Sequence, residues 1–137
     1  MSDISVTAAQ VGLVKPLEAR IVPYLAGATI TAGQAIYRYT DGTAKLTDAN
    51  TAPQFRGVAL NGGAAGQAID VCESGLLYGF GLSGLNADAM VYLSNTEGAL
   101  GASAGSTSVV AGRIVCLTDK SATKVLQVFA RPEADWS

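Results

Sequence analysis

Residues 35–46 read Ala35-Ile36-Tyr37-Arg38-Tyr39-Thr40-Asp41-Gly42-Thr43-Ala44-Lys45-Leu46, which is two strand-like runs with an Asp-Gly turn between them. Short runs rich in β-branched and aromatic residues, bounded by turn residues, are typical of strands. Asp-Gly between two such runs is a strong hairpin signal, because both residues tolerate a positive φ. The stretch therefore predicts a β-hairpin.

Further short apolar runs follow along the chain, separated by clusters of Gly, Asp, Asn and Ser. Few windows hold a 3.6-residue apolar period, and the chain contains 16 glycines, so helix signals are poor. Evenly spaced short strands with glycine-rich turns predict an all-β fold, a small β-barrel or sandwich-like domain. The expected strands are residues 57–60, 68–72, 75–80, 90–93, 112–117 and 124–130.

The length of 137 residues fits one domain. We expect residues 1–20 to form an extended N-terminal arm and residues 21–137 a single β domain, because periodicity is weaker at the start of the chain. Residues 7–11 are compatible with a short helix or with a continuation of that arm.

An internal repeat relates residues 31–72 to residues 86–128. At a displacement of 55 residues, Tyr37 aligns with Tyr92 and Gly57 with Gly112. We interpret this as a duplicated three-strand unit, since such a unit of about 40 residues is marginal alone while two of them can bury a shared core. Chance similarity between two glycine-rich β segments is the alternative.

The composition favours a subunit of an assembly. Charged residues make up 15% of the chain, against about 25% in an average soluble domain, and the formal net charge is −2. Uncharged or apolar surface more often meets a partner than solvent. The alternative is a compact monomer with a Ser/Thr/Gly/Ala surface. The sequence contains no basic patch that would indicate nucleic-acid binding. It also contains no apolar run close to the roughly 20 residues of a membrane span.

Residue types that carry chemistry are scarce. The chain has no histidine, and its two cysteines, Cys72 and Cys116, lie in apolar runs, where we expect buried, reduced thiols. Asp70 and Glu73 form a possible carboxylate pair, but solvent-facing residues at a strand end are the simpler interpretation. We therefore expect no enzyme and no catalytic, cofactor-binding or metal-binding residue. The first ten residues do not resemble a secretory signal, so synthesis in a cytosol is expected.

Aromatic residues offer candidates for contacts between subunits. Tyr37 and Tyr39 are two positions apart, as are Tyr78 and Phe80, so each pair is expected on one strand face. Together with Trp136, these residues are the candidate subunit interface. The alternative is a carbohydrate-binding β-module that uses the four tyrosine and phenylalanine rings as a platform.

Glycine and small-residue patterns recur in four runs of the chain: Ala32-Gly33-Gln34-Ala35-Ile36-Tyr37, Phe55-Arg56-Gly57-Val58-Ala59-Leu60, Ala89-Met90-Val91-Tyr92-Leu93-Ser94 and Gly112-Arg113-Ile114-Val115. These runs resemble the head decoration, or capsid cement, proteins of tailed bacteriophages, which are encoded beside the major capsid protein. The resemblance covers about residues 25–130.

This resemblance implies a β-clip or β-tulip type of domain and a protein made in the host cytoplasm that ends on the exterior of the virion. Such proteins form trimers at the three-fold and quasi-three-fold positions of the expanded capsid, where they bridge neighbouring major capsid protein subunits. The apparent tandem repeat departs from the best-known members. A tail or head-fibre component is the alternative. By analogy, the arm is the candidate capsid contact, with residues Ile4, Val6, Val11, Leu13 and Val14.

Overall fold

The fold is all-β, as the sequence predicts. The computed structural model describes residues 3–14, 17, 19–50, 54–82, 85–117 and 120–130. Within these ranges, the 3₁₀ turn η1 (Ala8–Gln10) accompanies ten strands. The strands are β1 (Gly12–Leu13), β2 (Arg20–Leu25), β3 (Ala35–Arg38), β4 (Ala44–Leu46), β5 (Gly57–Ala59), β6 (Ala68–Tyr78), β7 (Met90–Leu93), β8 (Leu100–Gly101), β9 (Val110–Leu117) and β10 (Lys120–Phe129).

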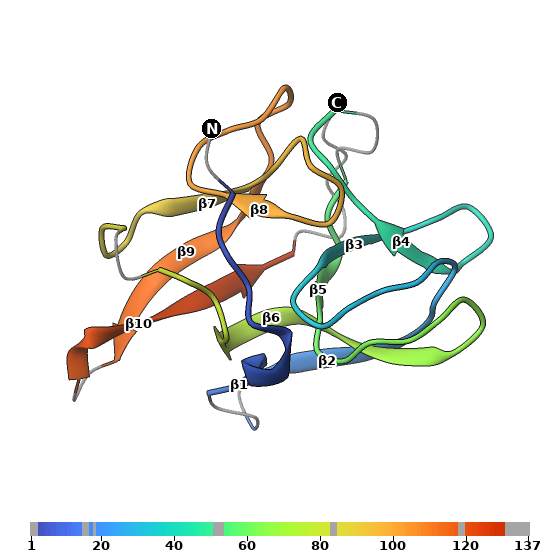
Figure 1. Ribbon diagram of the computed structural model, residues 1–137, viewed down its shortest axis with the longest axis horizontal. Helices are drawn as coiled ribbons and strands as arrows, with labels where there is room; N and C mark the ends of the chain where they lie inside the picture. The colour runs from blue at the N-terminus through green and yellow to red at the C-terminus, as the bar shows by residue number, and fades with distance from the viewer. Residues whose placement is uncertain are drawn as a thin grey trace.

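The strands form one curled antiparallel sheet (Figure 1). Its order is β4-β3-β5-β6-β10-β9-β7-β8, and β1 and β2 also pair with β6. The first half of the chain supplies one side of the molecule and the second half supplies the other, with β6 running between them (Figure 1). The expected hairpin is β3–β4, in which Tyr37 pairs with Lys45 across a turn where Gly42 has a φ of +89°.

The strand pairs of the first half recur in the second half at the displacement of 55 residues that the sequence repeat shows. The β3–β5 pairing has the same register as the β7–β9 pairing, and the β5–β6 pairing has the same register as the β9–β10 pairing. Equal register across three strands agrees with a duplicated unit. The matching pairs are Ala35–Val58 with Met90–Arg113, Ile36–Gly57 with Val91–Gly112, Val58–Cys72 with Arg113–Gln127, and Ala59–Val71 with Ile114–Leu126.

The repeating unit is larger than the three strands expected. Val22 of β2 pairs with Val71 of β6, and the same displacement turns this pair into Leu77–Leu126, which joins β6 to β10. Unit one thus consists of β2, β3, β4, β5 and the first part of β6. Unit two consists of the second part of β6, β7, β8, β9 and β10. The separate strands expected at residues 68–72 and 75–80 are therefore one continuous strand.

Sequence analysis missed β1, β2 and β8. Strand β2 has the sequence Arg20-Ile21-Val22-Pro23-Tyr24-Leu25, and an internal proline argues against a strand. Among the described residues β2 pairs with β6 alone, so it is an edge strand, where a missing N–H group is tolerated.

Each unit has its own buried core. The core of unit one contains Tyr24, Ala26, Ile30, Ile36, Ala44, Ala59, Ile69 and Val71. The core of unit two includes Leu77, Leu82, Val91, Leu100, Ile114 and Leu126, several of which are the equivalents of unit-one core residues. Fully buried Ala35, Val58 and Cys72, from the opposite face of unit one, pack into this second core. The core of unit two is therefore shared by both units, whereas, among the described residues, the core of unit one contains residues of unit one alone.

Glycine at positions 57 and 112 follows from close strand approach. A Cβ at Gly112 would overlap the carbonyl oxygen of Gln127, and a Cβ at Gly57 would lie 2.5 Å from that of Cys72. Gln127 is the repeat equivalent of Cys72, so the same contact occurs in both units.

We expect Gly112→Ala to lower the free energy of unfolding by about 2–4 kcal/mol, because the added methyl group forces two paired strands apart. Urea denaturation followed by circular dichroism measures this. Gly12→Ala is the matched control, since no atom lies within 4 Å of a Cβ there, and it should change the value by less than about 0.5 kcal/mol. Equal stability of the two variants would contradict the assigned strand contact.

Candidate functional site

The described part of the N-terminal arm lies against the chain's own sheet, between β8 and the segment that follows β6. The Ile4 N–H donates to the Leu100 carbonyl at 2.8 Å, and the Gly81 N–H donates to the Ser5 carbonyl at 2.9 Å. Asp3 forms a bridge with Gly101, and Val6 forms one with Phe80. The arm thus behaves as a short extra strand.

The five candidate capsid contacts differ widely in exposure. Ile4 is 8% exposed and belongs to the core of unit two, so its side chain is not accessible to a partner. Val11, Leu13 and Val14 are half-buried. Val6 is 38% exposed and is the most accessible of the five. An apolar residue in a terminal segment gives no sign in the sequence of whether it fills its own core or meets another protein.

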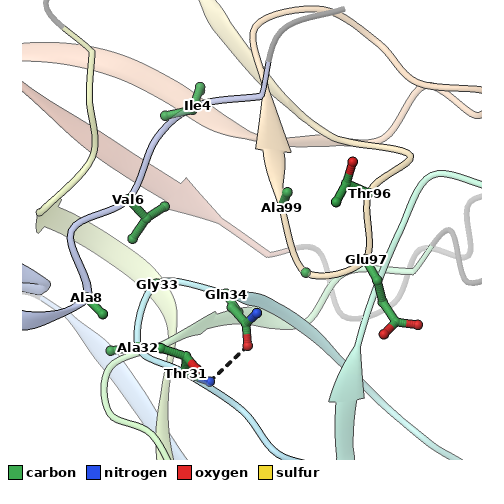
Figure 2. A pocket seen from close by; sticks show the side chains of 11 residues that line it. Ile4, Val6, Ala8, Thr31, Ala32, Gly33, Gln34, Thr96, Glu97 and Ala99 are labelled. Carbon is green, nitrogen blue, oxygen red and sulfur yellow. Dashed lines mark hydrogen bonds between the residues drawn. The ribbon is translucent and has the colours of Figure 1, made fainter.

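A cleft of about 360 Å³ opens beside the arm (Figure 2). Its walls come from the arm at Ile4, Val6 and Ala8, from residues 31–34 and from residues 96–99. The Thr31 N–H donates to Gln34 Oε1 at 2.9 Å, which closes the first of these turns. Glu97, on the exposed rim, is the ionisable group among the lining residues. The other lining residues are uncharged.

The candidate interface aromatics do not form one surface. Tyr37 and Tyr39 contact each other edge to face, with ring centroids 6.3 Å apart, and Lys45 Nζ lies 3.9 Å over the Tyr39 ring. These residues are on β3 and the segment after it, whereas Tyr78 ends β6, two places along in the sheet. Trp136 lies outside the described residues.

The expectation that Tyr78 and Phe80 share a face is wrong. Tyr78 is 42% exposed, whereas Phe80 is buried in the core of unit two. The intervening Gly79 has a φ of +103°, which interrupts the alternation of an extended strand. The sequence signal that could have shown this is the glycine itself.

A polar cluster that the sequence analysis missed surrounds Glu73 in the middle of β6. Glu73 is buried, accepts a hydrogen bond from the Tyr24 hydroxyl at 3.1 Å and pairs with Arg20 Nε at 3.0 Å. The Arg38 guanidinium lies 4.5 Å over the Tyr24 ring. Burial, followed by the charge of Glu73, raises the pKa of Tyr24. The cluster ties β2 to β6 and leaves the Tyr24 hydroxyl as a neutral donor.

Asp70 and Glu73 do not converge as a carboxylate pair. Asp70 is exposed, and it contacts Asn61, which accepts a hydrogen bond from the Asp70 N–H at 3.0 Å. Glu73 is engaged by Arg20 and Tyr24 instead.

Both cysteines are free thiols, as expected. Cys72 is fully buried, and burial raises the pKa of its thiol to about 11. Cys116 is half-buried, so it is more accessible than the sequence predicts. Cys72 thus packs as a small apolar side chain.

No three His, Cys, Asp or Glu side chains in the described ranges gather closely enough to hold a metal ion. In that same part of the chain, no helix has the length and apolar character needed to cross a membrane. Comparison of the chain with protein-family models, curated proteins and solved structures finds no match.

We expect Tyr24→Phe to lower the free energy of unfolding at pH 7 by about 1–3 kcal/mol, because Glu73 loses a hydrogen bond while remaining buried. The pKa of Tyr24 is raised in the folded state, so its contribution is complete below pH 10 and is lost as the pH rises above it.

The stability difference between the unmodified protein and Tyr24→Phe should therefore shrink as the pH rises above 10. Urea denaturation between pH 7 and pH 11 measures it. Tyr78→Phe is the control, because Tyr78 is exposed. This substitution should leave the free energy of unfolding unchanged at each pH. A Tyr24→Phe difference that grows with pH would contradict the assigned hydrogen bond.

Proposed function

We propose that this protein is a structural component of a bacteriophage head, binding the outer surface of the capsid as a trimer at three-fold and quasi-three-fold sites and stabilising the shell. The observation that carries the proposal is the N-terminal segment, which pairs with the sheet as a short extra strand and leaves Val6 exposed while Ile4 is buried. The sequence resemblance to head decoration proteins assigns capsid contact to this same segment.

A decoration protein needs a body that keeps its contact residues in fixed positions. The shared core provides this, because Ala35, Val58 and Cys72 of unit one are buried in the core of unit two. Each contact with the shell can then be modest, because a trimer engages the lattice at several points and gains avidity. The low charge of the chain, with 15% charged residues, suits close packing against another protein.

Exposed apolar side chains on β2 support an interface with another subunit. Ile21 is 40% exposed and Leu25 is 50% exposed, and their spacing places them on one face of this edge strand. Exposed apolar residues gathered on one element mark interaction sites more often than chance. We assign this face of β2, with Tyr39 and Tyr78 as further candidates, to contacts between subunits.

A carbohydrate-binding module is less well supported. Stacking against a sugar requires an aromatic ring with a free face, and Lys45 Nζ already lies over the Tyr39 ring. Phe80, the fourth residue of the expected platform, is buried. A tail or head-fibre component shares the fold and composition, so it differs from our proposal in the particle surface that it binds.

The test is co-sedimentation of the purified protein with expanded, undecorated capsids, with tail fractions as the comparison. We expect binding to capsids, and we expect Val6→Asp to weaken it by at least about tenfold, because a carboxylate would be desolvated in an apolar contact. Thr40→Asp, in the exposed β3–β4 turn, is the control and should bind normally.

Light scattering should give three times the mass of the chain. Absence of capsid binding by the unmodified protein refutes the proposal, and binding to tails alone supports the alternative. Circular dichroism of Val6→Asp separates lost contact from lost folding.

A further inference from the structure

The N-terminal arm fills a gap in the sheet of unit two. At the equivalent place in unit one, the two neighbouring segments pair directly, with no strand between them. In unit one, Ala26 bridges Ala44 directly, and the Gly27 N–H donates to the Ala44 carbonyl at 2.8 Å. The equivalents of Ala26 and Ala44 in unit two are Gly81 and Leu100. Leu100 lies 56 residues after Ala44, because the β7–β8 hairpin is one residue longer than the β3–β4 hairpin. Gly81 and Leu100 instead form their hydrogen bonds with the arm, at Ser5 and Ile4.

The gap recognises the arm through side chains as well as through its backbone. Ile4 enters the core of unit two. Asp3 Oδ1 accepts a hydrogen bond from Ser94 Oγ at 2.5 Å, and the Thr7 N–H donates to the Gly79 carbonyl at 2.9 Å. The gap is thus built to hold an extended segment with an acidic residue followed by a large apolar one.

The arm is joined to the body by a segment that has the properties of a hinge. Residues 8–11 contain the turn η1, none of whose residues is buried. The N–H groups of Gln10 and Val11 donate to Thr7 and Ala8 within that turn. A 3₁₀ turn rises about 2.0 Å per residue, and an extended strand rises about 3.3 Å, so straightening this segment lengthens the reach of the arm.

Beyond the hinge the chain is fixed again. The Val14 N–H donates to the Leu76 carbonyl, and β1 pairs with β6. Movement of residues 3–7 therefore leaves the rest of the N-terminal segment in place.

We propose that the gap between β8 and residues 79–81 is a strand-binding site that accepts residues 3–7 of a second copy of this chain, so that neighbouring copies exchange arms when they assemble. Exchange replaces each contact of the arm with the identical contact on a neighbour, so it costs little energy. Because the contacts of Asp3 and Ile4 fit the gap to the sequence of this arm, the partner that we propose is another copy of the same chain.

Cysteine cross-linking tests the exchange. A Cβ at position 81 would lie 3.5 Å from the Ser5 Cβ, within the range of about 3.5–4.5 Å that a disulfide requires. Full-length chains carrying Ser5→Cys and full-length chains carrying Gly81→Cys, distinguished by different tags and both containing Cys116→Ser, are co-expressed and oxidised. Non-reducing electrophoresis and mass spectrometry then identify covalent heterodimers.

We expect a heterodimer linked by a disulfide between positions 5 and 81, in at least about tenfold greater amount than with a control pair in which Thr40→Cys replaces Gly81→Cys. Thr40 lies in the exposed β3–β4 turn, away from the gap. A heterodimer no more abundant than in the control overturns the proposal.

A single chain that carries both Ser5→Cys and Gly81→Cys gives an independent measurement. Exchange predicts covalent oligomers, whereas an internal disulfide in a monomer, or no disulfide between the two introduced thiols, overturns the proposal. Should Gly81→Cys fail to fold, Asp3→Cys with Gly101→Cys provides a second cross-strand pair with the same interpretation.

Discussion

The whole fold depends on β6, which forms hydrogen bonds with β1, β2, β5 and β10. One strand can serve both units because of an irregularity at Glu73, where Arg20 pairs with Ser74 but the next residue, Ile21, pairs with Cys72. An extra residue in one strand shifts the side-chain alternation after it. Val71 consequently lies in the core of unit one and Leu77 in that of unit two. The ion pair of Glu73 with Arg20, whose side chain is 71% exposed, ties β2 to β6 at this point.

The two units share their strand pairing but differ in what their outer faces meet. Val58 and Cys72 of unit one are buried under unit two, whereas their equivalents, Arg113 and Gln127, are partly exposed. Arg113 also hydrogen-bonds to the Asp88 carbonyl. Polar outer faces also occur on the terminal repeats of repeat proteins, where they keep the repeat soluble. The polar side chains at positions 113 and 127 explain why this face of unit two forms no apolar contact like that of Val58 and Cys72.

The sequence predicted features that depend on local chemistry. It identified the Asp41-Gly42 turn and the register of Gly57 with Gly112, because turn residues and close strand contacts require particular residue types. It did not predict that β6 is continuous or that Glu73 is buried, since both depend on pairing between residues about 50 positions apart. The burial of Ile4 was missed for the same reason, because its partner is Leu100.

The position of the arm also has a consequence for synthesis. Residues 3–7 leave the ribosome before Leu100 and Gly101, their partners on β8. At about 5–20 residues per second, the ribosome takes about 5–20 s to make the intervening chain. Throughout that interval Ile4 has no core to enter, and nascent chains on one messenger are close neighbours. Under the proposed exchange of arms, this interval is the time at which an arm is free to pair with a neighbouring chain.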